Sequence, residues 1–104
     1  MKVMYKMEPK PTDGHKSFYG KCEVYIMEDG TKVMFSYDTL IASQEVDGTI
    51  HRYFEGMYCG YNGRYGISAT TSRHIRSVFN VDMKYFKNLQ VENLPKKYES
   101  VYHF

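Results

Sequence analysis

The stretch that decides the fold is Tyr65–Asn80, YGISATTSRHIRSVFN, which joins a glycine- and tyrosine-rich run to the clearest helical pattern of the chain. Three of its apolar residues recur at i, i+3 and i+4: Ile75, Val78 and Phe79. That spacing places them on one side of a helix, where they can cover a sheet. Thr70 or Thr71 would supply the N-cap hydroxyl. The sequence therefore predicts a helix over residues 71–80 that packs on strands built by the preceding residues.

Two Asp-Gly pairs divide those preceding residues into hairpins. Asp29-Gly30 lies between the alternating runs KCEVYIME and TKVMFSY, and Asp47-Gly48 lies between TLIASQEV and TIHRYFEG. Asp-Gly is a preferred centre of the two-residue type I′ hairpin turn. The link at residues 37–39 is short enough to join both hairpins into one antiparallel meander.

A two-residue turn at each Asp-Gly pair predicts a register. In the first hairpin the facing pairs are Glu28 with Thr31, Ile26 with Val33, Val24 with Phe35, and Cys22 with Tyr37. The last three pairs share one apolar face, which we expect to be buried. In the second hairpin the pairs are Val46 with Thr49, Gln44 with His51, Ala42 with Tyr53 and, on the other face, Ile41 with Phe54. Both faces of this hairpin carry apolar residues, so its inward face stays open.

These elements define an α+β fold. It has an antiparallel meander of about four to five strands, with Met1–Met7 as an edge strand, packed by the main helix over 71–80. Asp82 would cap a short second helix over 82–89. We expect one domain over residues 1–104, ending in a tail or a docked extension at 95–104.

Composition narrows the class of protein. The 104 residues include 11 Tyr and 6 Phe but no Trp, and such a tyrosine content suits a recognition surface or a wet core margin. No apolar run approaches the length of about 18 residues that a membrane helix needs, and the N-terminus lacks the apolar centre of a signal peptide. We therefore expect a cytoplasmic protein that has no membrane partner. Cys22 and Cys59 would then be free thiols.

The residues that suit metal or catalytic chemistry are scattered. The zinc-compatible side chains are His15, Cys22, His51, Cys59, His74 and His103. No local spacing brings two of them together, so neither a metal nor a cofactor is expected. A nucleophilic pair of Cys59 with a histidine lacks both a signature and an orienting carboxylate. We expect a protein that is not an enzyme, in which His74 makes a structural hydrogen bond.

The run GMYCGYNGRYG at residues 56–66 is the main candidate for recognition. Asn62-Gly63 predicts a tight turn, and tyrosine with glycine and asparagine provides adaptable contacts around stiff rings. The predicted partner-binding residues are Tyr58, Tyr61, Arg64, Tyr65, Arg73 and Arg76. Tyrosine and arginine are chosen because they concentrate binding energy at interfaces.

The distribution of charged residues along the chain supports a second function, the binding of nucleic acid. Residues 1–63 hold seven Lys/Arg and nine Asp/Glu, whereas residues 64–104 hold seven Lys/Arg and three Asp/Glu. This cationic second half is either a solvated surface or the phosphate-binding surface of a small nucleic-acid-binding module. In such a module phosphate contacts would come from Arg64, Arg73, Arg76, Lys84 and Lys87. The tyrosines would then stack on unpaired bases.

Two motifs carry a resemblance. Ser36-Tyr37-Asp38-Thr39, followed by Ile41-Ala42, and the later stretch YGISATTSRHI at residues 65–75 resemble a family of small uncharacterised domains of bacteriophages and other mobile elements. In that family an S-Y-x-T strand precedes a Y-S-A-T-T-x-x-H-I helix start. The resemblance covers about residues 36–91 and implies no known activity. It implies a setting in which small proteins block host defence complexes, as anti-CRISPR proteins do. We therefore expect a non-enzymatic inhibitor or modulator that binds a bacterial host protein or protein–nucleic acid complex.

Overall fold

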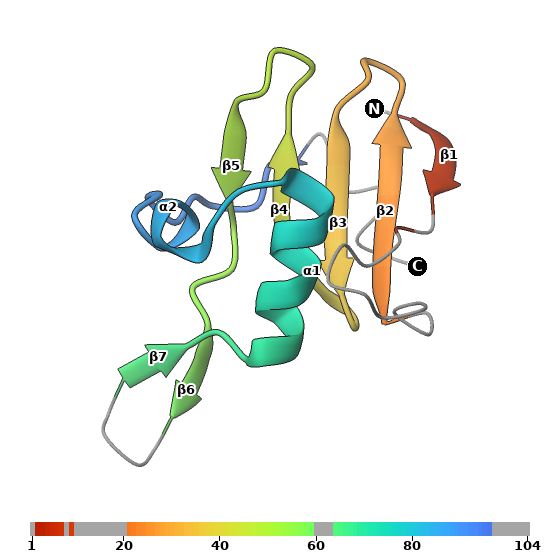
Figure 1. Cartoon of the computed structure of the whole chain (residues 1–104). Coiled ribbons are helices and arrows are strands. Elements are labelled where there is room, and N and C mark those ends of the chain that lie inside the picture. The colour runs from red at the N-terminus through yellow and green to blue at the C-terminus, as the bar shows by residue number, and fades with distance from the viewer. Residues whose placement is uncertain (1, 8, 10–20, 60–63, 97–104) are drawn as a thin grey trace.

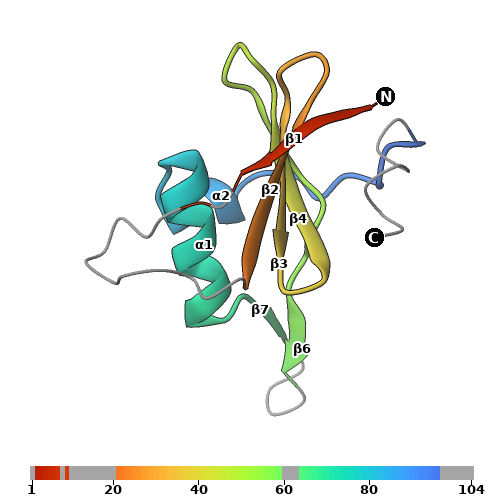
Figure 2. The same ribbon diagram turned by 90° about the vertical axis from the view of Figure 1, so that its right-hand side faces the viewer.

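The computed structural model describes residues 2–7, 9, 21–59 and 64–96. Its elements are β1 (Val3–Met7), β2 (Cys22–Met27), β3 (Lys32–Ser36), β4 (Thr39–Gln44), β5 (Ile50–Arg52), β6 (Met57–Cys59), β7 (Arg64–Gly66), α1 (Ala69–Phe79) and α2 (Met83–Lys87). The first five strands form an antiparallel sheet in chain order, and β6 and β7 form a separate hairpin. Both helices lie on the same side of the sheet (Figures 1 and 2). The predicted α+β meander, its edge strand and its main helix are confirmed.

The first Asp-Gly turn has three loop residues instead of two. The N–H of Met27 donates to the carbonyl of Thr31 at 2.9 Å, and Gly30 has a φ of +88°. This is the geometry of a type I turn followed by a left-handed glycine, the usual three-residue hairpin loop. Asp29 Oδ1 accepts from the N–H of Thr31 at 3.0 Å, so the aspartate stabilises this longer turn.

The second Asp-Gly turn repeats the arrangement. The N–H of Glu45 donates to the carbonyl of Thr49 at 2.9 Å, and Gly48 has a φ of +97°. Asp47 Oδ1 accepts from the N–H of Thr49 at 2.9 Å. Both turns therefore share one Asp-Gly-Thr arrangement in which the side chain of the aspartate bonds the threonine that precedes the return strand.

The extra loop residue shifts both registers by one, so the predicted pairings of both hairpins were wrong. In the first hairpin the facing residues are Cys22 with Ser36, Glu23 with Phe35, Val24 with Met34, Tyr25 with Val33, and Ile26 with Lys32. In the second they are Ala42 with Arg52, Ser43 with His51, and Gln44 with Ile50. Because side chains alternate along a strand, a shift of one residue moves every partner to the other face. Tyr37, which was predicted to pair with Cys22, instead lies in the β3–β4 turn and is 50% exposed.

The sequence left open which face of the second hairpin points inward, and a bulge in β4 brings both Ile41 and Ala42 to the side of the helices. Met34 faces Ala42 while Phe35 faces Leu40, which leaves Ile41 as the extra residue. A bulge places two successive residues opposite one partner, and here both Ile41 and Ala42 are buried in the cluster beneath the helices. The carbonyl of Ile41 accepts two backbone N–H groups, at 2.9 and 3.2 Å.

The sheet has a hydrophobic cluster on each face. Beneath the helices lie Cys22, Val24, Met34, Ile41, Ala42, Ile50, Ile75, Phe79 and Phe86. On the opposite face lie Tyr25, Met27, Val33, Phe35 and Leu40, with Val3 and Tyr53 packed against them. Apolar residues therefore occupy both sides of the strands, which explains why the alternation of the second hairpin was ambiguous. The predicted burial of Ile75 and Phe79 is confirmed.

The main helix begins earlier than predicted. Ser68 is its N-cap, because Ser68 Oγ accepts from the N–H of Thr71 at 3.1 Å. The predicted cap at Thr70 or Thr71 was wrong, since the Thr71 hydroxyl is bonded to β3 instead. α1 ends at Phe79 and is capped by Asn80, whose φ of +55° is the left-handed conformation that ends many helices.

The second helix and the segment after it agree in part with the sequence pattern. α2 lies within the predicted 82–89, and Asp82 caps it by accepting from the N–H of Tyr85 at 2.7 Å. After α2, Val91 forms a single parallel bridge to Arg52. Of the predicted tail at 95–104, residues 97–104 lie outside the described part of the chain.

His51 fastens that last segment to the sheet. Its Nδ1 lies 2.8 Å from Glu92 Oε2 and its Nε2 lies 3.0 Å from Glu45 Oε2. The bond to Glu45 is the main cause that raises the pKa of His51; burial lowers this pKa, and the bond to Glu92 and the charges of both carboxylates raise it further, so that the net shift is upward. A protonated imidazole donates from both nitrogens, so the charged form of His51 holds both carboxylates.

Candidate functional site

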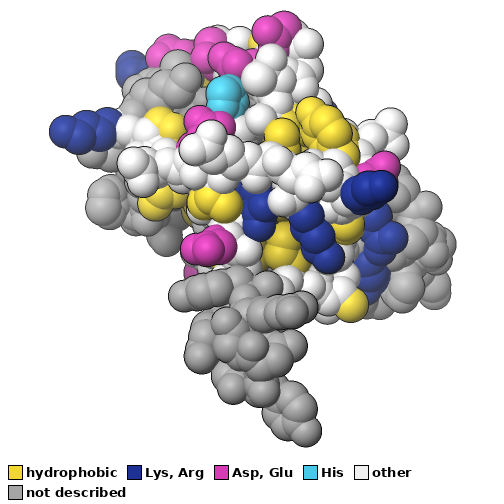
Figure 3. All heavy atoms as spheres, turned by 90° about the vertical axis from the view of Figure 1, so that its left-hand side faces the viewer, with side chains coloured by type: hydrophobic (Ala, Val, Ile, Leu, Met, Phe, Trp, Pro, Cys, Tyr) yellow, Lys and Arg dark blue, Asp and Glu magenta, His cyan; other side chains and the backbone are white. Residues whose placement is uncertain are grey.

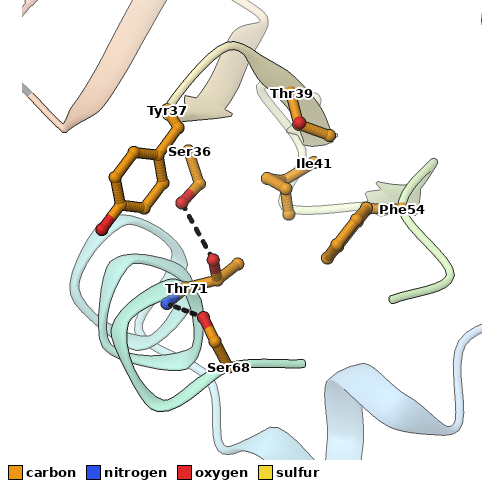
Figure 4. A pocket seen from close by; sticks show the side chains of 7 residues that line it. All are labelled: Ser36, Tyr37, Thr39, Ile41, Phe54, Ser68 and Thr71. Atoms are coloured by element: carbon orange, nitrogen blue, oxygen red, sulfur yellow. Dashed lines mark hydrogen bonds between the residues drawn. The ribbon is translucent and has the colours of Figure 1, made fainter. Parts of the chain in front are cut away.

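A cavity of about 340 Å³ opens between the β3–β4 turn and the start of α1. It is lined by Ser36, Tyr37, Thr39, Ile41, Phe54, Ser68 and Thr71. Figure 4 shows Ile41 and Phe54 on one side of it and the hydroxyl groups of Ser36, Thr71 and Ser68 on the other. Because Ser68 caps the start of α1 and β3 ends at Ser36, the cavity lies where the main helix meets the sheet.

A buried polar network stands behind the hydroxyl side of the cavity. Ser36 Oγ lies 3.0 Å from Thr71 Oγ1 and 2.8 Å from His74 Nδ1. Ser36, Thr71 and His74 are 2%, 7% and 1% exposed. The structural hydrogen bond that was predicted for His74 is therefore confirmed, and it joins α1 to the last residue of β3.

The burial of His74 favours the uncharged form of its imidazole. Burial, and to a lesser extent the charge of Arg73, lowers the pKa of His74 below its ordinary value of 6.5. A general base works best when its pKa lies near the operating pH, and this shift moves His74 away from it. The contact between Ser36 and His74 therefore suits a structural network better than an activated nucleophile.

The sequence did contain a signal for this cavity. Ser36 and Thr71 are polar residues at positions whose neighbours in the pattern are apolar, and buried hydroxyls require partners. Five of the seven residues that line the cavity also come from two motifs that carry the resemblance, S-Y-x-T at 36–39 and S-A-T-T at 68–71. The sequence pattern does not show that these two motifs lie next to each other in the folded protein.

The predicted recognition run forms the β6–β7 hairpin. Tyr58 lies opposite Tyr65 and Cys59 opposite Arg64, a register that leaves residues 60–63 between the two strands. The predicted tight turn at Asn62-Gly63 lies outside the described residues. Figures 1 and 2 show β6 and β7 extending away from the five-stranded sheet. Tyr61 and the side chains of Tyr58, Arg64 and Tyr65 lie outside the described part of the structure.

The two helices carry a basic surface. Between Ala69 and Lys87 the basic residues are Arg73, Arg76, Lys84 and Lys87, and the acidic residue is Asp82. Arg73 is partly buried, and the other three basic residues are exposed. Figure 3 shows Lys and Arg side chains gathered on the side of the molecule that carries α2, with hydrophobic side chains between them. We call these four residues the basic helical face; Arg73 and Arg76 were predicted for it.

A buried arginine that the sequence did not reveal fixes the base of the hairpin. Arg52 is 8% exposed and its guanidinium donates to four carbonyls, those of Phe54, Glu55, Lys87 and Leu89, at 2.9–3.2 Å. Its Cζ also lies 5.3 Å from the centroid of the Phe86 ring, close enough for a cation–π contact. Arg52 thereby ties the segment that leads into β6 to the end of α2.

The residue types that suit metal or thiol chemistry are described only in part. No group of three or more His, Cys, Asp or Glu side chains that could hold a metal ion occurs among them. Cys22 is a buried free thiol, and burial raises its pKa to about 12. The side chain of Cys59, together with His15 and His103, lies outside the described part.

Within the described residues, neither α1 nor α2 has the length and apolar character needed to cross a bilayer.

Fold and cavity together define a small sheet-and-helix domain with a projecting hairpin and a mixed polar and apolar pocket. The model of a family of unknown function, DUF8033, matches residues 5–90. The chain belongs to that family. No curated protein and no solved structure matched the chain. The expectation of an uncharacterised family is thus confirmed; the family model covers residues 5–90, whereas the resemblance covered residues 36–91.

Proposed function

We propose that the protein is a non-enzymatic binding module that holds a protein partner between the β6–β7 hairpin and the basic helical face. The observation that carries this proposal is the placement of the hairpin. It extends from the domain beside the helices (Figure 1), and only residues 67 and 68 separate β7 from α1. A hairpin with three tyrosines and an adjoining basic surface combines the residue types that dominate interface energy.

The charge of the helices points to an acidic partner. Four basic residues against one acidic residue between Ala69 and Lys87 create a local positive potential. Such a potential accelerates association with an acidic surface and disfavours basic partners. The attachment of the hairpin by Arg52 limits the motion of its base, which lowers the entropy that binding must overcome.

The biological setting of the proposal comes from the resemblance to phage and mobile-element domains. In that setting the partner is a bacterial host protein or protein–nucleic acid complex in the cytoplasm, and binding blocks a host defence complex in the way anti-CRISPR proteins do. Small size and a projecting hairpin suit such an inhibitor, because it acts by occupying a surface and needs no chemistry of its own.

The tyrosines provide the direct test. In a variant with Tyr58, Tyr61 and Tyr65 all changed to alanine, affinity for a captured partner should fall by about 100-fold or more, because interface tyrosines concentrate binding energy. Tyr5→Ala is the matched control, since Tyr5 is 58% exposed on the edge strand β1. Unchanged affinity in the triple variant, with the circular dichroism of the wild type, would show that the hairpin is not the contact surface.

A nucleic-acid-binding module is the second candidate, and the basic helical face is the observation that favours it. Phosphate contacts from that face would make binding weaken steeply with salt, and tyrosines of the hairpin would stack on unpaired bases. Fluorescence anisotropy with labelled single-stranded DNA and RNA, at about 20 and 150 mM salt, separates the two candidates. Binding at low salt that is lost at the higher concentration supports this function, and its absence at low salt removes it.

A further inference from the structure

We propose that the cavity at the start of α1 is a binding site for an uncharged aromatic ring that carries a hydroxyl or carbonyl group. The cavity measures about 340 Å³, at the lower end of the range of about 300–1,000 Å³ that small-molecule sites occupy. Such sites combine apolar walls with a few convergent polar groups, and this one has both.

The lining determines the charge and shape of the ligand. None of the seven lining residues is Asp, Glu, Lys or Arg, and a charged ligand without a partner there would lose its hydration uncompensated. The apolar side chains of Ile41 and Phe54 lie opposite the hydroxyls (Figure 4). A flat ring placed between them would pack one side on carbon and turn an edge toward oxygen.

The hydroxyl side is arranged to bond that edge. Ser68 Oγ accepts from the N–H of Thr71, and a hydroxyl that accepts one bond keeps its own hydrogen to donate. Ser36 Oγ is fixed between Thr71 and His74, which limits the rotation of the Ser36 hydroxyl. Because the O–H of Ser68 can donate, the ligand group must offer an acceptor oxygen, as a hydroxyl or a carbonyl does.

Tyr37 at the rim adds an aromatic wall held in an unusual backbone conformation. Its φ is +56°, which a bulky residue rarely adopts and which is often found where structure serves binding. The N–H of Tyr37 donates to the carbonyl of Lys21 at 2.6 Å, and the Tyr37 ring lies 6.2 Å from the ring of His74. The conformation is therefore fixed from two sides, although glycine would adopt it without strain.

The cavity also adjoins both connections of the hairpin. Phe54 belongs to the segment that enters β6, and Ser68 follows β7 by one intervening residue. A ring in the cavity would contact both connections. The ring can belong to a free small molecule or to a tyrosine side chain of a protein partner, and the chemistry of recognition is the same.

Titrations followed by ¹⁵N–¹H NMR test the proposal with four probes: 4-methylphenol, N-acetyl-tyrosinamide, toluene and 4-methylbenzoate. With 4-methylphenol we expect saturable shifts at the amides of residues 36–41 and 68–71, with a Kd of about 1 mM for a ligand of this size. Toluene, which lacks the hydroxyl, should bind about fivefold more weakly. Binding of N-acetyl-tyrosinamide as tight as that of 4-methylphenol assigns the ring to a partner protein, and weaker binding assigns it to a free molecule.

Two threonine variants provide the matched control. Thr39 lines the cavity from an exposed position, so Thr39→Phe should fill it and weaken binding of 4-methylphenol at least tenfold. Thr49→Phe places the same ring at an exposed turn position away from the cavity and should leave binding unchanged. Thr71→Val, which removes one hydroxyl, should weaken it about fivefold. The proposal is overturned by shifts that map elsewhere, by toluene or 4-methylbenzoate binding as well as 4-methylphenol, or by full binding in Thr39→Phe.

Discussion

Replacing Ser36 with alanine removes the hydroxyl that joins β3 to α1. Ser36 Oγ contacts Thr71 Oγ1 at 3.0 Å and His74 Nδ1 at 2.8 Å, and all three residues are at most 7% exposed. A buried polar group that loses its partner costs about 1–3 kcal/mol. Since two groups lose a bond here, Ser36→Ala should lower the free energy of unfolding by about 2–4 kcal/mol.

Ser43→Ala is the matched control on the same sheet. Ser43 is also buried, at 0% exposure, but its Oγ bonds the Tyr53 hydroxyl at 2.7 Å in a half-buried site. Loss of that one bond should cost about 0.5–1.5 kcal/mol, because the tyrosine hydroxyl can turn to water. Urea denaturation measures both values, and an unchanged slope with denaturant shows that the unfolded reference is the same. The reasoning is refuted if Ser36→Ala is no more destabilising than Ser43→Ala.

Three further predictions concern stability. The pKa of His51 is raised in the folded state. His51 therefore contributes fully to the free energy of unfolding below pH 6.5, and this contribution declines as the pH rises through the folded pKa. Between pH 5.5 and 8.5 the free energy of unfolding should decline less in His51→Gln than in the wild type. Gly30→Ala should lower the Tm more than Gly48→Ala: both glycines have positive φ, but a Cβ at Gly30 would lie 2.7 Å from a valine methyl, whereas Gly48 has open space. Arg52→Met removes four hydrogen bonds to carbonyls and should cost about 2–4 kcal/mol in urea denaturation, with the hydrogen exchange of α2 amides rising most.

The hairpins were predictable in kind but not in register. Asp-Gly suits a two-residue turn with two left-handed residues and also a three-residue loop that ends in a left-handed glycine. The sequence around Gly30 and Gly48 satisfies both. What decides between them is the bond from the aspartate side chain to the following threonine, and alternation cannot reveal it because both strand faces are apolar.

The position of α1 was predictable only to within two residues, because several hydroxyl groups compete to be its N-cap. Ser68, Thr70 and Thr71 all offer a hydroxyl that can cap a helix. The contact of Thr71 with Ser36, 35 residues away, removes Thr71 from that role. The cavity depends on the same long-range contact, so it was visible in the sequence only as polar residues within apolar patterns.

The buried role of Arg52 had no local signal. Its neighbours alternate as in an ordinary edge strand, and its four carbonyl partners come from the β5–β6 connection and the end of α2. The sequence identified the hairpin and the basic residues as candidates for binding, while the structure shows how the base of the hairpin is held beside α2.

The proposed binding surface is tested most directly by charge reversal on its basic helical face. Three tagged proteins are used to capture partners from a bacterial lysate: the wild type, a variant with Arg76→Glu and Lys84→Glu, and a control with Lys2→Glu and Lys96→Glu at exposed positions outside α1 and α2. The salt concentration is about 150 mM, at which exposed charges act within about 8 Å. We predict one complex that the wild type and the control retain and the helix variant loses. Equal recovery of that complex by all three proteins would contradict the account.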